Sequence, residues 1–222
     1  MAKSFTTAHG SAKKNNIEYA KLEMGKNEFR LVGELLPRYA YWKTLSSGGN
    51  NFSIPVECLS FDREKEEFTN LEHDHFKDAF PEERPVWSYL IQCLDKNNKL
   101  LMFGLKRKLF DQIMSAAETL GDPTDPEKGW PIIFEKKKTG PNAYNIEYTL
   151  LSLQLKPAAL TAEQKEAIKD MKPIEEIVPR QTAEQQNAFI QQAWFSAKEE
   201  TNVDNESIDE LDPTANDDDI PF

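Results

Sequence analysis

Aromatic and cationic side chains are interleaved in one short segment of this 222-residue chain. The six residues 38–43 hold three aromatic rings and two cations and read Arg38-Tyr39-Ala40-Tyr41-Trp42-Lys43. Aromatic rings stack on nucleic-acid bases for about 1–3 kcal/mol per base whatever the sequence, while Lys and Arg neutralise phosphates. This mixture is typical of a surface that binds single-stranded nucleic acid.

Further aromatic residues and two cationic clusters occupy other segments. Trp87 and Tyr89 alternate along a predicted strand and would share one face, and Tyr144 belongs to a predicted hairpin. The clusters are 106–108 and 136–138, the second predicted near the tip of that hairpin. The predicted DNA-binding residues are therefore Arg38, Tyr39, Tyr41, Trp42, Lys43, Trp87, Tyr89, Lys106, Arg107, Lys108, Lys136, Lys137, Lys138 and Tyr144.

A plainer interpretation exists for each of these positions taken singly. Tyr and Trp are common in the cores of β-barrels, and a run of lysines usually forms a solvated turn. The coincidence of aromatic and cationic clusters in one chain favours binding over this alternative.

The last six residues form a candidate site of different chemistry. They place three carboxylates before an apolar tip with a terminal carboxylate, in the order Asp217-Asp218-Asp219-Ile220-Pro221-Phe222. A partner pocket with an apolar slot, a cation for the terminal carboxylate and a basic rim would bind this peptide. An acidic tail that only solubilises the protein would not need the Ile-Pro-Phe ending.

The acidic charge is confined to the C-terminal third of the chain. The net charge is −11, yet residues 1–160 carry 22 acidic and 22 basic side chains. Residues 199–222 contain ten Asp or Glu and no Lys or Arg, with few large apolar residues. Such a segment cannot bury enough apolar surface to fold alone, and we expect a disordered acidic tail. The net charge therefore does not exclude a nucleic-acid partner for the first 160 residues.

The first half of the chain has the pattern of β-strands. Apolar runs at 29–36, 52–61 and 85–94 predict three strands, of which Pro37 would end the first. Turn residues at 95–98 predict a hairpin to a returning strand at 99–103. The charged insertion at 62–83 gives no clear prediction.

One helix and a second hairpin follow these strands. Apolar residues from Leu109 to Leu120 recur at helical spacing, and Gly121 followed by Pro123 supplies a stop. Residues 131–137 and 143–153 then predict a hairpin. The whole pattern predicts a mainly β fold, a five-stranded OB-fold barrel with one or two helices.

The sequence divides the chain into four parts. Residues 1–25 form a flexible N-terminal arm, 26–157 the barrel, 158–198 a helical extension and 199–222 the acidic tail. Within the extension, Thr161 with Gln164 and Thr182 with Gln185 match capping boxes, which predicts short helices at 161–171 and 182–198.

The sequence resembles two known families in different parts. Its terminal Asp-Asp-Asp-Ile-Pro-Phe resembles the tip through which bacterial single-stranded DNA-binding proteins recruit replication, recombination and repair enzymes. Residues 26–157 more closely resemble the helix-destabilising single-stranded DNA-binding proteins of tailed bacteriophages. The similar segments are a strand reaching Leu35-Leu36-Pro37, the segment Ile54-Pro55-Val56-Glu57-Cys58, a Trp-containing strand, the 121–129 segment that begins Gly-Asp-Pro-Thr-Asp, and Gly140-Pro141-Asn142-x-Tyr144.

One feature of that phage family is missing from this sequence. Its well-studied members hold a structural zinc with one His and three Cys in an insertion. Here the insertion offers His73 and His75, with Cys58 and Cys93 far to either side and no CxxC pair. We therefore expect no metal, and the His73-Asp74-His75 trio to be an exposed polar loop.

Other classes of protein lack sequence support. The chain has no P-loop, GxGxxG, GxSxG or HExxH motif, so we expect neither a cofactor nor an enzyme. No apolar run approaches the length of a membrane span, the polar N-terminus does not resemble a secretory signal, and two cysteines suit a reducing compartment. These features predict a cytoplasmic protein, in the host bacterium if a phage encodes it.

The predicted function is sequence-independent binding and protection of single-stranded DNA during phage DNA replication, recombination and repair. The tail would compete with DNA and recruit partner proteins, and the N-terminal residues could support self-association on DNA. The alternative is a protein-interaction module whose Asp-Asp-Asp-Ile-Pro-Phe tip sequesters host replication or repair enzymes without binding DNA.

Overall fold

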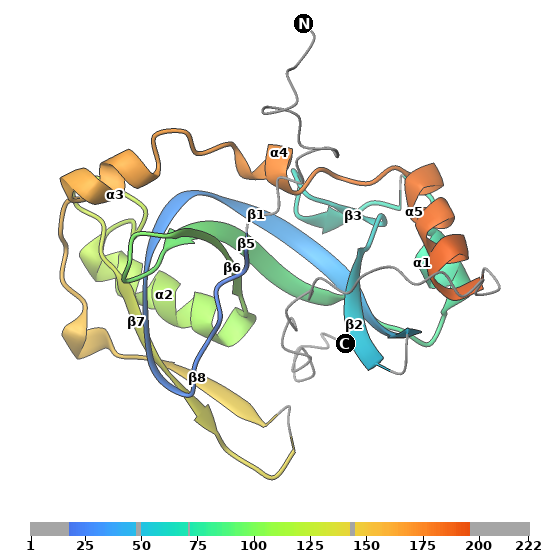
Figure 1. Cartoon of the computed structure of the whole chain (residues 1–222), viewed down its shortest axis with the longest axis horizontal. Helices are drawn as coiled ribbons and strands as arrows, with labels where there is room; N and C mark the ends of the chain where they lie inside the picture. Colours follow the sequence, from blue (N-terminus) through green and yellow to red (C-terminus); the bar gives the residue numbers. More distant parts are fainter. Residues whose placement is uncertain (1–17, 48–49, 71, 143–144, 196–222) are drawn as a thin grey trace, which may run out of the picture.

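The computed structural model describes residues 18–47, 50–70, 72–142 and 145–195. One antiparallel sheet dominates these ranges, in the order β6-β5-β1-β7-β8, with β2 also paired to β1 (Figure 1). Its strands are β1 (Gly25–Ser47), β2 (Asn50–Glu57), β5 (Val86–Leu94), β6 (Leu100–Leu105), β7 (Ile132–Lys138) and β8 (Ile146–Leu150). The prediction of a mainly β fold is confirmed.

Strand β1 is the long, curved strand at the centre of the sheet. Its first residues pair with β7, its middle with β5 and its last residues with β2. The prediction that Pro37 ends this strand is wrong. Pro37 pairs with Tyr89 of β5 but lies before the start of the β2 pairing at Ala40, so its missing N–H removes no ladder hydrogen bond on that side. An irregularity between Val32 and Leu36 bends the strand, and Gly33 there adopts φ +75°.

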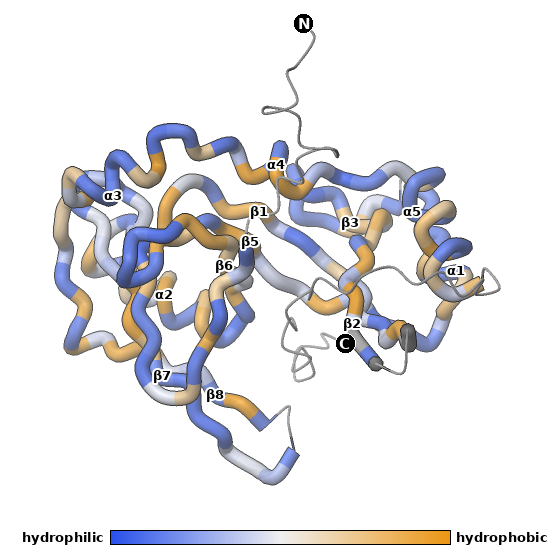
Figure 2. The backbone as a smooth tube through the Cα atoms, viewed as in Figure 1, coloured by the Kyte–Doolittle hydropathy of each residue, from blue (hydrophilic) through white to orange (hydrophobic). Residues whose placement is uncertain are grey.

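The main core lies between one face of the curved sheet and helix α2 (Arg107–Leu120). Strand alternation directs apolar side chains of β1, β5, β6, β7 and β8 to this face, and α2 contributes Leu109 and Ile113. The helix ends at Gly121 with φ +82°, as predicted, and the Trp130 indole N–H donates to the Gly121 carbonyl at 2.9 Å. Figure 2 shows the hydrophobic stretches of β1, β5 and β6 beside the more hydrophilic outer part of the β7–β8 hairpin.

The insertion whose structure the sequence left open forms a small hairpin and a short helix. Strands β3 (Phe61–Asp62) and β4 (Glu67–Phe68) pair with each other, and α1 (His75–Ala79) follows. Phe61 and Phe76 are buried in a second core beneath the far end of β1.

The C-terminal segment up to residue 195 runs along the outside of the sheet from one end to the other (Figure 1). It contains a 3₁₀ turn (Ser152–Gln154), α3 (Ala162–Ala167), α4 (Ile174–Ile177), α5 (Ala183–Ile190) and a π-helical turn (Gln191–Phe195). Both predicted capping boxes are present, at Thr161 and Thr182. Ile174 and Ile190 are buried against different parts of the sheet. This segment therefore packs on the sheet as part of one folded unit.

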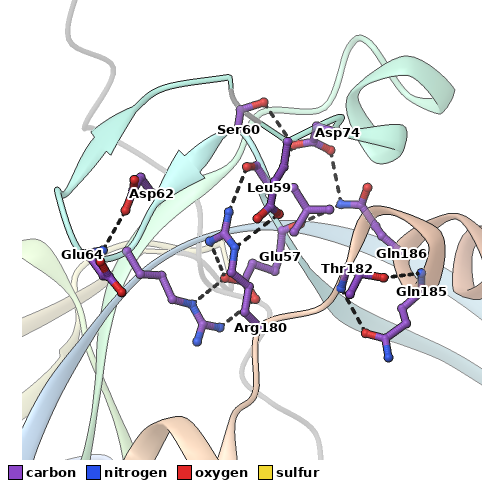
Figure 3. A network of polar contacts seen from close by, with 12 residues as sticks. Glu57, Leu59, Ser60, Asp62, Glu64, Asp74, Arg180, Thr182, Gln185 and Gln186 are labelled. Atoms are coloured by element: carbon purple, nitrogen blue, oxygen red, sulfur yellow. Dashed lines mark hydrogen bonds and ion pairs between the residues drawn. The ribbon is translucent and has the colours of Figure 1, made fainter.

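A buried polar network joins the insertion, the end of β2 and α5 (Figure 3). The Arg63 guanidinium donates to both carboxylate oxygens of Glu57, at 2.6 and 2.7 Å, and the Gln186 amide donates to the Glu57 carbonyl at 2.8 Å. Asp74 accepts from the Leu59 backbone N–H at 3.1 Å and caps the start of α1. Buried polar groups of this kind are stable only when paired, so the network fixes how the three segments meet.

Among the described residues, no helix combines the length and the apolar character needed to cross a membrane.

Candidate nucleic-acid interface

Two neighbouring groups of aromatic rings line one part of the sheet, and we call them together the aromatic surface. Its β5 part contains Trp87 and Tyr89, whose ring centroids are 4.8 Å apart. Phe110 of α2 lies 5.6 Å from Trp87 and 4.8 Å from Tyr89. Trp87 is half-buried, so part of its ring remains accessible.

Tyr39 extends this surface across to β1 and the insertion. It is the register partner of Trp87, and register partners in an antiparallel pair share a face of the sheet. Its ring lies 4.8 Å from both Phe61 and Phe68. The aromatic surface therefore comprises the half-buried rings of Tyr39, Trp87 and Phe110 and the exposed ring of Phe68, with Phe61 and Tyr89 buried beneath them.

Cations border the aromatic surface at the start of α2. The Arg107 guanidinium lies 5.8 Å from the Trp87 ring centroid, and the Lys106 ammonium lies 5.5 Å from that of Tyr148. Arg107 and Lys108 are exposed, and Arg107 is 3.8 Å from Asp111. The first turn of α2 contains no acidic residue, and Lys106 provides no side-chain cap. Cations at a positive helix end oppose the helix dipole but suit an anion such as phosphate.

The two predicted cationic clusters meet around Tyr148. Lys136 of β7 is the register partner of Tyr148, the ring beneath Lys106. The Lys136 ammonium also donates to the Leu22 carbonyl at 3.1 Å. Lys137 and Lys138 are exposed, and Glu135 at 2.8 Å raises the pKa of Lys137. The fold therefore brings Lys106 and Lys136, 30 residues apart in the sequence, to the same tyrosine ring, and we call this part of α2 and β7 the cationic area.

Tyr89 is only 8% exposed, within the main core, and two further predicted DNA-binding residues, Arg38 and Tyr41, are also buried. The Arg38 guanidinium is enclosed near Tyr19 and Glu57, burial lowers its pKa, and its Nε has no hydrogen-bond partner among the described residues. Tyr41 is 1% exposed and donates to Asp74 Oδ2 at 3.1 Å, and burial raises its pKa. Neither side chain reaches the surface to meet a base or phosphate.

The remaining members of segment 38–43 lie apart from each other. Trp42 faces the opposite side of the sheet from Tyr39, because side chains alternate along a strand. Lys43 pairs with Glu83 at 2.7 Å and lies over the Phe80 ring at 4.1 Å. The compact cluster in the sequence is therefore divided between two faces and two cores. Tyr144 and residues 217–222 lie outside the described residues.

The sequence interpretation missed Phe61 and Phe68 and assigned Phe110 only to the helix core. Phe110 could have been found, since it lies two residues after Lys108 and on the helix face that meets β5. Phe68 lies in a segment without periodicity, and no sequence signal pairs it with Tyr39.

The histidines of the insertion lie at the start of α1, with His73 exposed and His75, its first residue, half-buried. Their rings are 4.3 Å apart, and His73 Nε2 lies 2.9 Å from Asp78. Asp74, between them, is not exposed as predicted but turned inward as the helix cap. Within the described ranges no group of three or more His, Cys, Asp or Glu side chains is arranged to hold a metal ion. Both cysteines are buried thiols, and burial raises the pKa of Cys58 to about 11.

Comparison with known proteins gives one informative similarity. A protein of Escherichia phage T5 with the name "Probable ssDNA-binding protein" is 31% identical to this chain over 163 residues. The match covers 67% of this chain and 59% of the phage T5 protein, so the chain spans less than two thirds of the length of that relative. No protein-family model matches the chain. No solved structure matches it either.

Proposed function

We propose that this protein binds single-stranded DNA without sequence preference and has no catalytic role. The observation that carries the proposal is the aromatic surface with the Arg107 guanidinium beside Trp87, together with the cations Lys106 and Lys136 at Tyr148. Rings stack on any base and cations contact only the backbone, so this arrangement selects unpaired strands and not a sequence. The name of the similar phage T5 protein supports the same class of function.

The order of the strands supports an OB-fold for the core. Path β6-β5-β1-β7-β8 with α2 between β6 and β7 suits a five-stranded barrel of the kind that binds oligonucleotides. We infer that a strand of DNA would cross the barrel over the aromatic surface and the adjoining start of α2.

The acidic tail would compete with DNA for the cationic area and would also bind partner proteins. Ten carboxylates on a tether would reach the cationic area at an effective concentration near the millimolar range, set by linker length. DNA in the interface would release the tail, and the tip 217–222 would then recruit replication, recombination or repair proteins in the host cytoplasm. Self-association along DNA through the N-terminal arm belongs to the same proposal.

The test is a fluorescence-anisotropy titration of labelled single-stranded and duplex oligonucleotides at two salt concentrations. We expect tight, salt-sensitive and sequence-tolerant binding of the single strand. Arg107→Ala/Lys108→Ala should weaken it about 10-fold or more, because two phosphate contacts are lost. The control Lys165→Ala/Lys169→Ala removes the same charge from exposed positions on α3 and beyond.

Two outcomes would contradict the proposal in different ways. Equal losses in both double variants would mean that only total charge matters and that the α2 start is not the interface. No binding of single strands by the intact protein would move the function to the tail, as a module that captures host enzymes through its tip.

A further inference from the structure

The β3–β4 hairpin brings an unusual exposed ring to the aromatic surface. Phe68 is 50% exposed, although its ring is in contact with Tyr39 and lies 5.5 Å from that of Phe61. A phenyl ring at the edge of a stacking surface, half in water, has area available for a planar partner. This exposure therefore extends the aromatic surface beyond Trp87 towards the insertion.

Polar contacts hold the hairpin in this position. The Tyr89 hydroxyl donates to Glu66 Oε2, which ties the hairpin turn to the middle of the aromatic surface. Glu66 has φ +52°, in the left-handed region that few non-glycine residues adopt. On the other side of the hairpin, the Arg63 side chain is only 10% exposed, and its guanidinium donates two hydrogen bonds to the Glu57 carboxylate. These contacts therefore fix the position of the turn that precedes Phe68.

The hairpin is acidic where the opposite end of the aromatic surface is basic. Residues 61–68 carry the carboxylates of Asp62, Glu64, Glu66 and Glu67. Of its two cations, Arg63 is paired with Glu57, and Lys65 lies 3.7 Å from Asp62. The surface thus runs from Arg107 beside Trp87 to carboxylates beside Phe68.

Bases and phosphates respond differently to such a gradient. An uncharged base can stack on Phe68 beside carboxylates, whereas a phosphate there would be repelled. A single strand can turn its bases inward and leave its phosphates to the cations. A duplex presents two phosphate backbones outward, and its bases are already stacked on each other. Its phosphates would therefore be repelled by the carboxylates, and its bases would gain no stacking on Phe68.

We propose that the β3–β4 hairpin is the element that discriminates between single-stranded and duplex DNA. Phe68 stacks on an unpaired base, and the carboxylates of Glu66 and Glu67 exclude the duplex backbone. This inference rests on the proposed function and adds a selectivity element to the same interface.

The first test is Phe68→Leu, measured by anisotropy with a single-stranded oligonucleotide. Loss of one stacked ring should weaken binding about fivefold or more. The control is Phe195→Leu, because Phe195 is 54% exposed and lies at the end of the π-helical turn, against Phe80. Thermal unfolding of both variants checks that the fold is intact. Equal affinities for the two variants would overturn the stacking role of Phe68.

The second test is Glu66→Gln/Glu67→Gln, measured with duplex and single-stranded oligonucleotides of equal length. Glutamine keeps an oxygen that accepts from Tyr89 but removes the charge. Duplex affinity should rise about 10-fold while single-strand affinity changes far less. Glu163→Gln/Glu166→Gln on α3 is the matched control for net charge. An equal rise in that control would overturn the exclusion role.

The two proposals fail in distinguishable ways. If the unmodified protein binds no single strand, the proposed function is wrong. If it binds single strands and both hairpin variants behave like their controls, only the hairpin inference is wrong.

Discussion

Two tryptophans show how the face of the sheet on which a residue lies can decide whether it is available to bind DNA. Trp87 and Trp42 have the same chemistry and are both half-buried, yet they face opposite sides of the sheet. Trp87 borders Tyr89, Phe110 and Arg107, whereas Trp42 is the register partner of Pro55. The pair therefore provides an internal comparison for the stacking role.

Trp87→Leu should weaken single-strand binding, and Trp42→Leu should not. Loss of one stacked base costs about 1–3 kcal/mol, or about 5- to 150-fold in Kd. Quenching of tryptophan fluorescence by DNA gives an independent measurement, since only Trp87 should be quenched. Equal effects of the two substitutions would place the interface elsewhere.

Residue Asp125 belongs to the 121–129 segment on which part of the family resemblance rests. Its carboxylate accepts from the backbone N–H groups of Lys128 at 2.8 Å and Glu127 at 2.7 Å, and its carbonyl accepts from Arg30 at 2.6 Å. A Cβ on Gly129 would lie 2.5 Å from that carbonyl oxygen, so only glycine fits there. The segment is thus a structural loop that closes over Arg30.

The stability contributed by the Asp125 carboxylate should depend on pH. The N–H groups of Lys128 and Glu127 lower its pKa in the folded state, so its contribution is present above the unfolded pKa of about 4 and is lost as pH falls below it. Asp125→Asn should therefore lower Tm at pH 7, and the difference in Tm should shrink as pH falls below about 4 towards the lowered pKa of the folded state. A constant difference in Tm across this range would refute the charge-assisted role.

At the scale of elements, the C-terminal segment acts as a strap that holds both ends of the sheet. Ile190 is 1% exposed in the second core, and the Gln186 amide, fully buried, bonds to the Glu57 carbonyl. The Trp194 indole donates to the Thr44 carbonyl of β1 at 3.2 Å. Helices as short as these are stabilised by packing on the sheet, and they in turn cover its apolar surface.

Ile190→Ala should destabilise the protein by about 2–5 kcal/mol, the usual cost of removing a buried aliphatic side chain. Leu153→Ala is the matched control, because Leu153 is 100% exposed and its truncation should change the free energy of unfolding by less than about 0.5 kcal/mol. Urea denaturation monitored by circular dichroism measures both. Comparable stability of the two variants would show that the strap does not contribute to the cooperative unit.

At the scale of the whole molecule, charge is divided between a neutral body and an acidic tail. Residues 161–222 carry the entire net charge of −11, while the cationic area lies on β7 and α2. Under the proposed function, this separation would let one chain attract phosphate and also carry its own competitor.

Deletion of residues 199–222 should raise affinity for DNA, and most for duplex DNA at low salt. In the proposed mechanism the tail would compete by charge alone, so the gain in affinity should shrink as salt screens both partners. Anisotropy titrations of the full chain and the truncated chain at two salt concentrations measure the effect. Unchanged or weaker binding after truncation would rule out competition by the tail.

Removal of Phe222 alone should leave DNA binding intact but abolish capture of partners.

The sequence by itself determined the local features of this protein. Alternation in 86–94, the helical spacing that ends at Gly121 and the capping boxes at Thr161 and Thr182 depend on neighbouring residues, and the structure has each of them. The mainly β class followed from these elements.

Tertiary structure alone decided which side chains share a surface. Segment 38–43 is continuous in sequence, but a strand sends alternate side chains to opposite faces, so Arg38 and Tyr41 are buried on different sides of the sheet. Conversely, Phe68, Tyr39 and Trp87 come together only because β1 pairs with β5 and the insertion folds back through Glu66. These are contacts between distant residues, which propensity and local pattern do not encode.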